Sequence, residues 1–275
     1  MDVSTALLQG TTLLEEASIA VPRLTAEVLL AHALRRDRVY LYAHPEHELS
    51  ELEWLHYGRY LHERLKGKPT QYITGRQEFY GREFRVTRDV MIPRPETEHV
   101  VETALRVAGG ARRIVDVGCG SGILAVTLRL ETGSTVWATD ISLPALRAAA
   151  GNAARLGAAV GFLAGDLTSP LDSNSVDLIV SNPPYVPLGE AAGLQREVRD
   201  WEPRAALFAG PTGLEIYEKL IRDAERVLRP GGCLIMELGF TSLAGVTAMF
   251  RARWCDIESI PDLAGIPRVI AAHIT

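Results

Sequence analysis

The sequence predicts an α/β protein in which a helix-covered parallel sheet follows a small N-terminal helical bundle. Its 275 residues exceed the roughly 100–200 that usually form one domain. Apolar residues recur at helical spacing from the start of the chain to about residue 75, without strand-like alternation. From Arg112 onward, short apolar runs alternate with helical stretches, which is the pattern of buried parallel strands joined by helices.

The composition is that of a folded globular protein. Hydrophobic residues make up 47% of the chain and charged residues 23%. The net charge of −5 argues against a stable nucleic-acid complex. No apolar run reaches the ~18 residues of a membrane helix, and the first residues lack the basic region of a signal peptide. Three dispersed cysteines, Cys119, Cys233 and Cys255, form neither a disulfide framework nor a metal site. We therefore expect a cytoplasmic protein without a metal or a membrane anchor.

A helical domain is expected at residues 1–75. One helix begins at Pro22, because proline favours the first turn of a helix. Another runs from Ser50 to Leu65, because Ser50 and Glu53 have the spacing of a capping box. Three leucines mark the expected apolar side of that helix: Leu52, Leu55 and Leu61.

A β-hairpin linker is expected at residues 76–95, followed by a third region at residues 96–275. The segment from Phe79 to Thr87 partly alternates apolar and polar residues, as a short hairpin does. Residues 59–94 carry nine basic and four acidic side chains. This charge belongs either to a solvated surface or to a patch that faces an acidic or RNA-bearing partner.

Five buried strands and two long helices are predicted in the third region. The strands are the apolar runs Ile114–Val117, Val136–Thr139, Gly161–Ala164, Leu178–Val180 and Leu234–Leu238. The helices are Leu143–Leu156 and Gly213–Leu228. Strands that alternate with helices in this way form a sheet with both faces covered.

A glycine-rich turn follows the first of these strands. The segment Ile114-Val-Asp-Val-Gly-Cys-Gly-Ser-Gly122 runs from the strand into a Gly-x-Gly-x-Gly turn, and a helix begins near Ile123. Glycine lets the backbone turn tightly and approach a ligand. Free amides at the helix start favour a negatively charged group such as a carboxylate. A dinucleotide-binding loop would have glycine at position 123, so the sequence disfavours NAD.

Acidic residues lie before this turn and after two later strands. Asp116 precedes the turn, Asp140 ends the next strand, and Asp166 follows the strand after that. A carboxylate at position 140 can accept hydrogen bonds from both hydroxyls of a ribose. Asp166 could accept from an exocyclic adenine amine. Together these residues resemble the S-adenosylmethionine site of Rossmann-like methyltransferases. Helix N-capping is the structural alternative for Asp140 and Asp166.

The tetrapeptide Asn182-Pro183-Pro184-Tyr185 stands at the carboxyl end of an apolar strand, where open α/β sheets bind ligands. Its prolines stiffen the turn and leave their carbonyls free, and its tyrosine offers an aromatic face. The Asn182 side chain and the Pro183 carbonyl could accept both N–H groups of a planar –NH₂. They would direct its nitrogen at a sulfonium methyl group. A rigid turn capped by asparagine is the structural alternative.

Two kinds of methyl acceptor suit this tetrapeptide: an exocyclic base amine, or a carboxamide such as a glutamine side chain. An enzyme that modifies a base must grip or extrude it and bind the polymer. An acidic chain with a small helical domain fits that task poorly. The basic stretch at residues 59–94 nevertheless leaves an adenine amino-methyltransferase acting on DNA or RNA as the alternative.

Four motifs, in this order, resemble the release factor glutamine methyltransferases (PrmC/HemK family). They are Phe79-Tyr-Gly-Arg-Glu-Phe, Ile92-Pro-Arg-Pro-Glu-Thr-Glu, Asp116-Val-Gly-Cys-Gly-Ser-Gly and Asn182-Pro-Pro-Tyr. The segment from Trp201 to Leu207 is also similar to the family. The resemblance covers nearly the whole chain. It implies a Rossmann-like class I methyltransferase sheet of seven strands, one of them antiparallel, and a helical domain that helps to hold a release factor.

The resemblance also implies an activity and its site residues. The enzyme would transfer a methyl group from S-adenosyl-L-methionine to the side-chain amide nitrogen of the glutamine in the Gly-Gly-Gln motif of peptide chain release factors. Asn182 and Pro183 would be catalytic, and would bind the glutamine together with Pro184 and Tyr185. The cofactor would be bound by Asn182 and by Gly118, Cys119, Gly120, Ser121 and Gly122 around its methionine part, Asp140 at the ribose, and Asp166 with Leu167 at the adenine.

Overall fold

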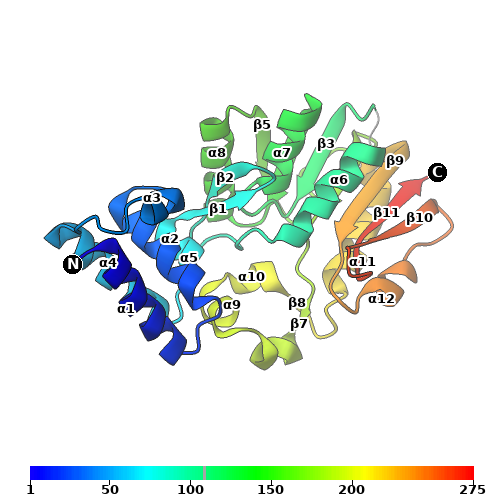
Figure 1. Cartoon of the computed structure of the whole chain (residues 1–275). Coiled ribbons are helices and arrows are strands. Elements are labelled where there is room, and N and C mark those ends of the chain that lie inside the picture. The colour runs from blue at the N-terminus through cyan, green and yellow to red at the C-terminus, as the bar shows by residue number, and fades with distance from the viewer. Residues whose placement is uncertain (108–109) are drawn as a thin grey trace. The chain divides into compact units, whose positions relative to one another are not determined.

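The computed structural model describes residues 1–107 and 110–275, which form two compact units (Figure 1). One unit comprises Met1–Arg76 together with Gln195–Trp201. The other comprises Gln77–Leu194 and Glu202–Thr275. The smaller unit has a hydrophobic core of its own, and the larger one has a core on each face of a sheet.

Helices build the smaller unit. They are α1 (Val3–Glu16), α2 (Pro22–Leu34), α3 (Arg38–Ala43), α4 (Glu51–Leu65), α5 (Thr70–Thr74) and α9 (Arg196–Trp201). As predicted, α2 begins at Pro22, and α4 begins after Ser50. The capping box forms in both directions: the Glu53 N–H donates to the Ser50 hydroxyl, and the Ser50 N–H donates to the Glu53 carboxylate at 2.8 Å.

The predicted apolar side of α4 is only partly right. Tyr57 and Leu61 are buried in the core of the helical unit. Leu52 and Leu55 are 61% and 66% exposed. With 3.6 residues per turn, these two leucines lie on the side of α4 opposite Tyr57. The leucine spacing alone indicated the wrong face because the tyrosine, a larger apolar body, takes the core position.

Helix α9 joins the helical unit although it lies far along the chain. The Arg64 guanidinium is 6% exposed and forms an ion pair with Glu197 at 2.6 Å. The Arg196 guanidinium donates to the Lys66 carbonyl at 3.1 Å. This helix was not predicted, because nothing in a six-residue segment reveals a distant partner.

The larger unit begins with the expected hairpin, formed by β1 (Arg76–Phe79) and β2 (Arg82–Arg85). Tyr80 and Gly81 connect the strands, both with positive φ, as a two-residue hairpin turn requires. Phe79 and Phe84 are buried in the hydrophobic core of this unit.

A seven-stranded sheet in the order β10-β11-β9-β6-β3-β4-β5 forms the centre of the larger unit. Its strands are β3 (Arg113–Val117), β4 (Thr135–Asp140), β5 (Val160–Ala164), β6 (Val176–Ser181), β9 (Leu228–Glu237), β10 (Trp254–Pro261) and β11 (Pro267–Ile274). Of these seven strands, β11 alone runs opposite to the other six. The predicted α/β fold with one antiparallel strand is therefore confirmed.

Helices cover both faces of this sheet (Figure 1). Residues of α6 (Glu98–Val107), α7 (Ile123–Thr132) and α8 (Leu143–Leu156) pack on one face. Residues of α11 (Glu215–Val227) and α12 (Leu243–Thr247) pack on the other. Shorter elements complete the unit: η1 (Pro95–Thr97), β7 (Val186–Pro187), η2 (Leu188–Gly193), α10 (Arg204–Leu207) and β8 (Phe208–Gly210).

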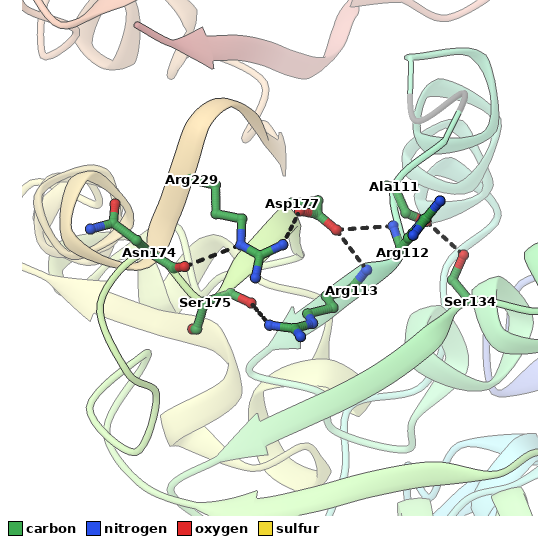
Figure 2. Close-up of polar contacts among 8 residues, drawn as sticks. All are labelled: Ala111, Arg112, Arg113, Ser134, Asn174, Ser175, Asp177 and Arg229. Carbon is green, nitrogen blue, oxygen red and sulfur yellow. Dashed lines mark hydrogen bonds and ion pairs between the residues drawn. The ribbon is translucent and has the colours of Figure 1, made fainter.

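Hydrogen bonds to Asp177 join the amino ends of the central strands (Figure 2). One carboxylate oxygen of Asp177, on β6, accepts from the N–H groups of Arg112 and Arg113 at the start of β3. Its other oxygen accepts from the Arg229 guanidinium of β9 at 3.3 Å. Three neighbouring strands are thereby held in register at the edge opposite the glycine turn.

Candidate active site

A cavity of about 380 Å³ lies at the carboxyl ends of β3, β4 and β6. Strand β3 has β4 on one side and β6 on the other. The strand order therefore reverses at β3: β4 and β5 extend the sheet to one side, and β6 and the later strands extend it to the other. Ligands of open α/β sheets bind at this kind of switch point. The volume falls in the range of roughly 300–1,000 Å³ that is typical of small-molecule sites.

Most of the predicted site residues line this cavity. They are Gly118, Cys119, Gly120, Ser121, Asp140, Asp166, Leu167, Asn182 and Pro184. Gly122, Pro183 and Tyr185 are not among the residues that line it. The structure therefore brings the glycine turn, the acids after two strands and part of the tetrapeptide together, although they come from four separate segments.

Several backbone amides of the glycine turn donate to other groups of the protein. Its three glycines, Gly118, Gly120 and Gly122, all have left-handed φ angles, which explains why glycine is needed. The N–H groups of Gly118 and Cys119 donate to the Thr139 carbonyl, at 2.9 and 3.0 Å.

The Gly120 N–H donates to Asp140 at 2.9 Å, and the Ala125 N–H at the start of α7 donates to Asp116 at 3.0 Å. These amides therefore donate to the protein's own carboxylates and to a strand carbonyl.

Asp140 holds two loops together. One of its oxygens accepts from Gly120, and the other accepts from the Ser142 N–H at 2.8 Å. The N-cap of α8 is Ser142, whose hydroxyl accepts from the Ala145 N–H, so helix capping is not the role of Asp140. Its half-buried carboxylate lies in the cavity wall with lone pairs left to accept from a ligand.

Asp116 presents a buried carboxylate to the cavity. It is 1% exposed, and burial raises the pKa of its carboxyl group to about 7. One oxygen accepts from Ala125. Within residues 1–107 and 110–275, its other oxygen has no hydrogen-bond partner. A buried acceptor of this kind is satisfied when a ligand supplies a donor or a positive charge.

Asp166 and Leu167 lie at the outer part of the cavity. The Asp166 side chain is 59% exposed and lies 3.6 Å from the Lys219 ammonium group. Leu167 has a left-handed φ of 48° and lines the cavity with its half-buried side chain. An aliphatic side chain here gives a flat ring an apolar contact surface.

Asn182 is held by two buried side chains. Its amide nitrogen donates to the Thr97 hydroxyl at 3.1 Å, and that hydroxyl donates to the Glu237 carboxylate at 2.6 Å. Thr97 comes from η1, and Glu237 ends β9. Neither partner was a predicted site residue. The Ile-Pro-Arg-Pro-Glu-Thr-Glu motif, which contains Thr97, was the signal that could have pointed to one of them.

Tyr185, which was expected to bind the substrate, is not among the residues that line the cavity. It packs against the core that includes Tyr217 and Leu238. A Cβ placed on Gly239 would lie 2.9 Å from the Tyr185 ring. Burial raises the pKa of the Tyr185 phenol to about 12. Pro183 is also buried. Rigid packing of the tetrapeptide against this core fixes the backbone from which Asn182 projects.

Two segments in the cavity wall were missed as site residues. Met91 and Pro93 come from the loop before η1, and Pro203, Ala206 and Phe208 come from the segment around α10. Glu202 links these two segments, since it accepts from the Ile92 N–H at 3.3 Å and from the Arg94 guanidinium. Both segments carried the family resemblance in the sequence, but resemblance alone did not show that their apolar residues form a wall.

Several side chains of the basic stretch at residues 59–94 are committed to ion pairs. Within the helical unit, Arg64 pairs with Glu197 and Lys68 pairs with Glu63. Within the larger unit, Arg82 pairs with Glu131 and Arg94 pairs with Glu202. These contacts reduce the positive charge that the stretch can offer to an acidic or RNA-bearing partner.

Comparisons with known proteins match both parts of the chain. The model of the PrmC N-terminal domain matches residues 5–75, and that of the methyltransferase small domain matches residues 98–194. A release factor glutamine methyltransferase of Koribacter versatilis is 46% identical over 264 residues, which cover 94% of each chain.

The chain belongs to the release factor glutamine methyltransferase family. Another release factor glutamine methyltransferase, from Nitratidesulfovibrio vulgaris, is 45% identical and covers 94% of this chain and 91% of its own. A crystal structure of a methyltransferase from Pyrococcus furiosus matches with a TM-score of 0.54 at 19% identity, over 71% of this chain and 90% of that one. The resemblance found in the sequence is therefore confirmed, and the fold is the Rossmann-like fold of class I methyltransferases.

Two features are absent from the part of this family member that the structure describes. No helix in that part of the chain is long and apolar enough to span a membrane. Nor does it contain a group of three or more His, Cys, Asp or Glu side chains placed to hold a metal ion. Burial raises the pKa of the Cys119 thiol well above its usual range, which makes this cavity residue a poor nucleophile.

Proposed function

We propose that this chain transfers a methyl group from S-adenosyl-L-methionine to the side-chain amide nitrogen of the glutamine in the Gly-Gly-Gln motif of peptide chain release factors. The observation that carries the proposal is that Asn182 lines the same cavity as the glycine turn and the carboxylates of Asp116 and Asp140. Membership of the family supplies the substrate class. Release factors act in the cytoplasm, which is where we place the enzyme.

The cavity fits the proposed cofactor. The unpartnered oxygen of Asp116 needs a donor or a positive charge, and the ammonium group of the cofactor provides both. Asp140 retains lone pairs for ribose hydroxyls. Gly118 and Gly120 keep the cavity floor free of side chains, since a Cβ on either one would point into open space. Asp166 and Leu167, in the outer wall, suit an adenine ring.

In the proposed mechanism, the protein orients and polarises the glutamine amide. The cofactor supplies, when bound, an electrophilic methyl group on a positively charged sulfur. An amide nitrogen is a weak nucleophile because its lone pair is delocalised. The Asn182 oxygen and the Pro183 carbonyl would each accept one N–H of the glutamine, which aims the nitrogen and stabilises the positive charge that develops on it. As the nitrogen gains the methyl group, one of these two protons would leave it for solvent, and a neutral N-methyl amide would remain. Pro184 and the partly buried Tyr185 hold this turn rigid.

The helical unit is proposed to bind the release factor. This refines the division expected from the sequence, with residues 1–75 for binding, 76–95 as a linker and 96–275 for catalysis, by adding Gln195–Trp201 to the binding part. Apolar side chains on its surface support the proposal, since exposed apolar groups mark interaction sites. They include Leu8, Leu52, Leu55 and Val39, which are 61–72% exposed.

The test is methylation of a purified release factor with an isotopically labelled cofactor. The label is expected in the Gly-Gly-Gln peptide, and a release factor with that glutamine replaced by alanine is the matched control. An unlabelled release factor, under conditions where calorimetry shows cofactor binding, would overturn the proposal. Methylated adenine in a treated DNA or RNA pool, with the release factor unchanged, would instead establish the base-modifying alternative.

A further inference from the structure

Three side chains from separate parts of the larger unit form a hydrogen-bonded chain that ends at the cavity. Glu237 accepts from the Thr97 hydroxyl at 2.6 Å, and Thr97 accepts from the Asn182 amide at 3.1 Å. Thr97 is fully buried and Glu237 is 2% exposed, so solvent does not compete for these bonds. Of the three, only Asn182 lines the cavity.

The direction of this chain is set by what each group can donate. A carboxylate has no proton, so it only accepts. The Thr97 hydroxyl has a single proton, and donating it to Glu237 leaves only lone pairs for Asn182. The amino half of the Asn182 carboxamide must therefore face Thr97. Its oxygen is then directed away from Thr97.

We propose that Glu237, acting through Thr97, is a positioning residue that makes Asn182 present its oxygen, and not its amino group, to the substrate amide. This inference rests on the proposed function, in which that oxygen accepts an N–H of the substrate glutamine. The two halves of a carboxamide have nearly the same shape, and its terminal torsion is roughly two-fold. Without a fixed partner, both orientations would be populated. In the inverted orientation, the amino group of Asn182 would face an N–H of the substrate amide, so that two donors would meet without an acceptor.

The end of β9 holds Glu237 in place. Its backbone carbonyl accepts from the Tyr217 hydroxyl of α11 at 2.9 Å. The same hydroxyl accepts from the Gly239 N–H at 3.1 Å. Both bonds are buried, so the strand end, and with it the carboxylate, is tied to the helix on the far face of the sheet.

Three charged side chains act on Glu237: Glu96, Arg94 and Arg268. Burial is the main cause that raises the pKa of Glu237 to about 7. Glu96 in η1 also raises it, whereas Thr97, Arg268 of β11 and Arg94 before η1 lower it. Tyr185 stays neutral in this range, because burial raises its own pKa to about 12.

Protonation of Glu237 should reverse the direction of the hydrogen bonds that join Glu237, Thr97 and Asn182. A neutral carboxyl group can donate to the Thr97 oxygen, and the threonine proton is then free to point at Asn182. The carboxamide would turn its oxygen toward Thr97 and its amino group toward the substrate. At saturating cofactor, kcat should therefore fall as the pH drops below about 7. Asp116 titrates in the same range, but it touches the cavity where the cofactor is proposed and should affect cofactor affinity.

The first test removes the Thr97 hydroxyl. Thr97→Val should lower kcat roughly 10- to 100-fold, by analogy with the loss of residues that orient metal ligands through a hydrogen bond. Cofactor affinity should change little, and Thr97→Ser should retain most of the kcat. Thr127→Val is the matched control, since Thr127 has a fully buried hydroxyl without a partner within residues 1–107 and 110–275. Its kcat should equal that of the wild type.

A double-mutant cycle separates positioning from general packing. If Thr97 acts through Asn182, Thr97→Val should cause no further loss of kcat in an Asn182→Ala enzyme. Multiplicative losses would show that Thr97 acts by another route and would overturn the inference. If Thr97→Val does not fold, as judged by circular dichroism, Glu237→Gln replaces it. That variant should abolish the fall in kcat below pH 7.

A spectroscopic measurement tests the chain without any turnover. The side-chain ¹H–¹⁵N signals of Asn182 should shift with a midpoint near pH 7 in the wild type and stay constant in Glu237→Gln. Signals that do not shift in the wild type would overturn the inference, even if the enzyme methylates release factors. Conversely, a wild-type enzyme that shows the shift but does not label the release factor would overturn the proposed function and leave only the orientation of Asn182 established.

Discussion

Asn182 is the residue through which the fold is proposed to hold the substrate amide. Its neighbours in the tetrapeptide are packed or rigid, and its side chain is held by Thr97 at the cavity wall. Asn182→Ala removes an interaction with the substrate nitrogen but leaves the glycine turn untouched. We expect kcat to fall far more than cofactor affinity. Steady-state kinetics and calorimetry on the same preparation measure the two effects, and equal losses in both would contradict the assigned role.

Substitution of Asp140 should mainly weaken cofactor binding, which is the opposite of the effect expected at Asn182. It anchors the glycine turn through Gly120 and the next loop through Ser142, in addition to its proposed contact with ribose. Asp140→Ala should weaken cofactor binding roughly 10- to 100-fold, since hydrogen bonds to charged groups contribute about 1.5–3 kcal/mol. Calorimetry measures this change. The exposed Asp172 supplies the control, because Asp172→Ala removes the same charge from the surface. Unchanged affinity in Asp140→Ala would argue against a cofactor role.

The place of some site residues could be predicted from the sequence, but their long-range contacts could not. The sequence indicated that Asp140 and Asn182 follow strands, and parallel strands bring such positions to one edge. It did not show that Tyr185 would pack against the core or that Glu237 would be linked to Asn182 through Thr97. Those outcomes depend on packing between segments that are far apart in the chain, such as the ring of Tyr185 against Gly239. No local spacing records them.

At the scale of elements, the junction between the glycine turn and α7 depends on a close approach to α8. Gly122 has a φ of 82°, and a Cβ added there would lie 3.0 Å from Ala149 Cβ and 3.2 Å from its Cα. Gly122→Ala should therefore destabilise the protein by roughly 1–3 kcal/mol, through backbone strain and this contact. Chemical denaturation monitored by circular dichroism measures the loss.

The control for this substitution lies on α8 itself. Gly151 is exposed within the helix, and a Cβ there would meet nothing within 4 Å. Gly151→Ala should stabilise the protein by about 0.5–1 kcal/mol, because alanine is the better helix former. A loss of stability in both variants would mean that strain at Gly122 is not the cause.

Elements whose own residues form an apolar run or a regular helical pattern were the easiest to predict. Strands β3, β4, β5, β6 and β9 were expected as apolar runs, and α8 was predicted with its observed bounds. Short elements such as α9 and α10 were missed, since six or four residues carry too little periodicity. Strands β10 and β11 were expected only through the family resemblance. The exposed residues of β10 interrupt any apolar run.

At the scale of the whole molecule, the buried carboxylates should make stability depend on pH. Folding raises the pKa of Asp116 from 3.8 to about 7, so the native state holds a proton that the unfolded chain loses above about pH 4. This contribution favours the native state at low pH and is lost as the pH rises toward 7. Glu237 acts in the same direction, from 4.5 to about 7.

We therefore expect that Asp116→Asn gains stability relative to the wild type when the pH rises from 5 to 7.5 without cofactor. Urea denaturation at the two pH values measures the difference. Asp262→Asn is the contrasting variant: its salt bridge with Arg268 lowers the pKa of Asp262, so it should show no such gain. A constant difference between Asp116→Asn and the wild type would mean that Asp116 titrates normally in the folded protein.

The helical unit is assembled from two stretches of chain, Met1–Arg76 and Gln195–Trp201. A single cut in the gene at residue 76 would therefore not yield two intact modules. The downstream fragment would carry α9 without the Arg64 partner of Glu197, and the upstream fragment would leave the buried guanidinium of Arg64 without its carboxylate. Recombination that exchanged only the N-terminal segment would have to preserve this one ion pair across the joint. Inheritance of the two units as one piece is the expected evolutionary result.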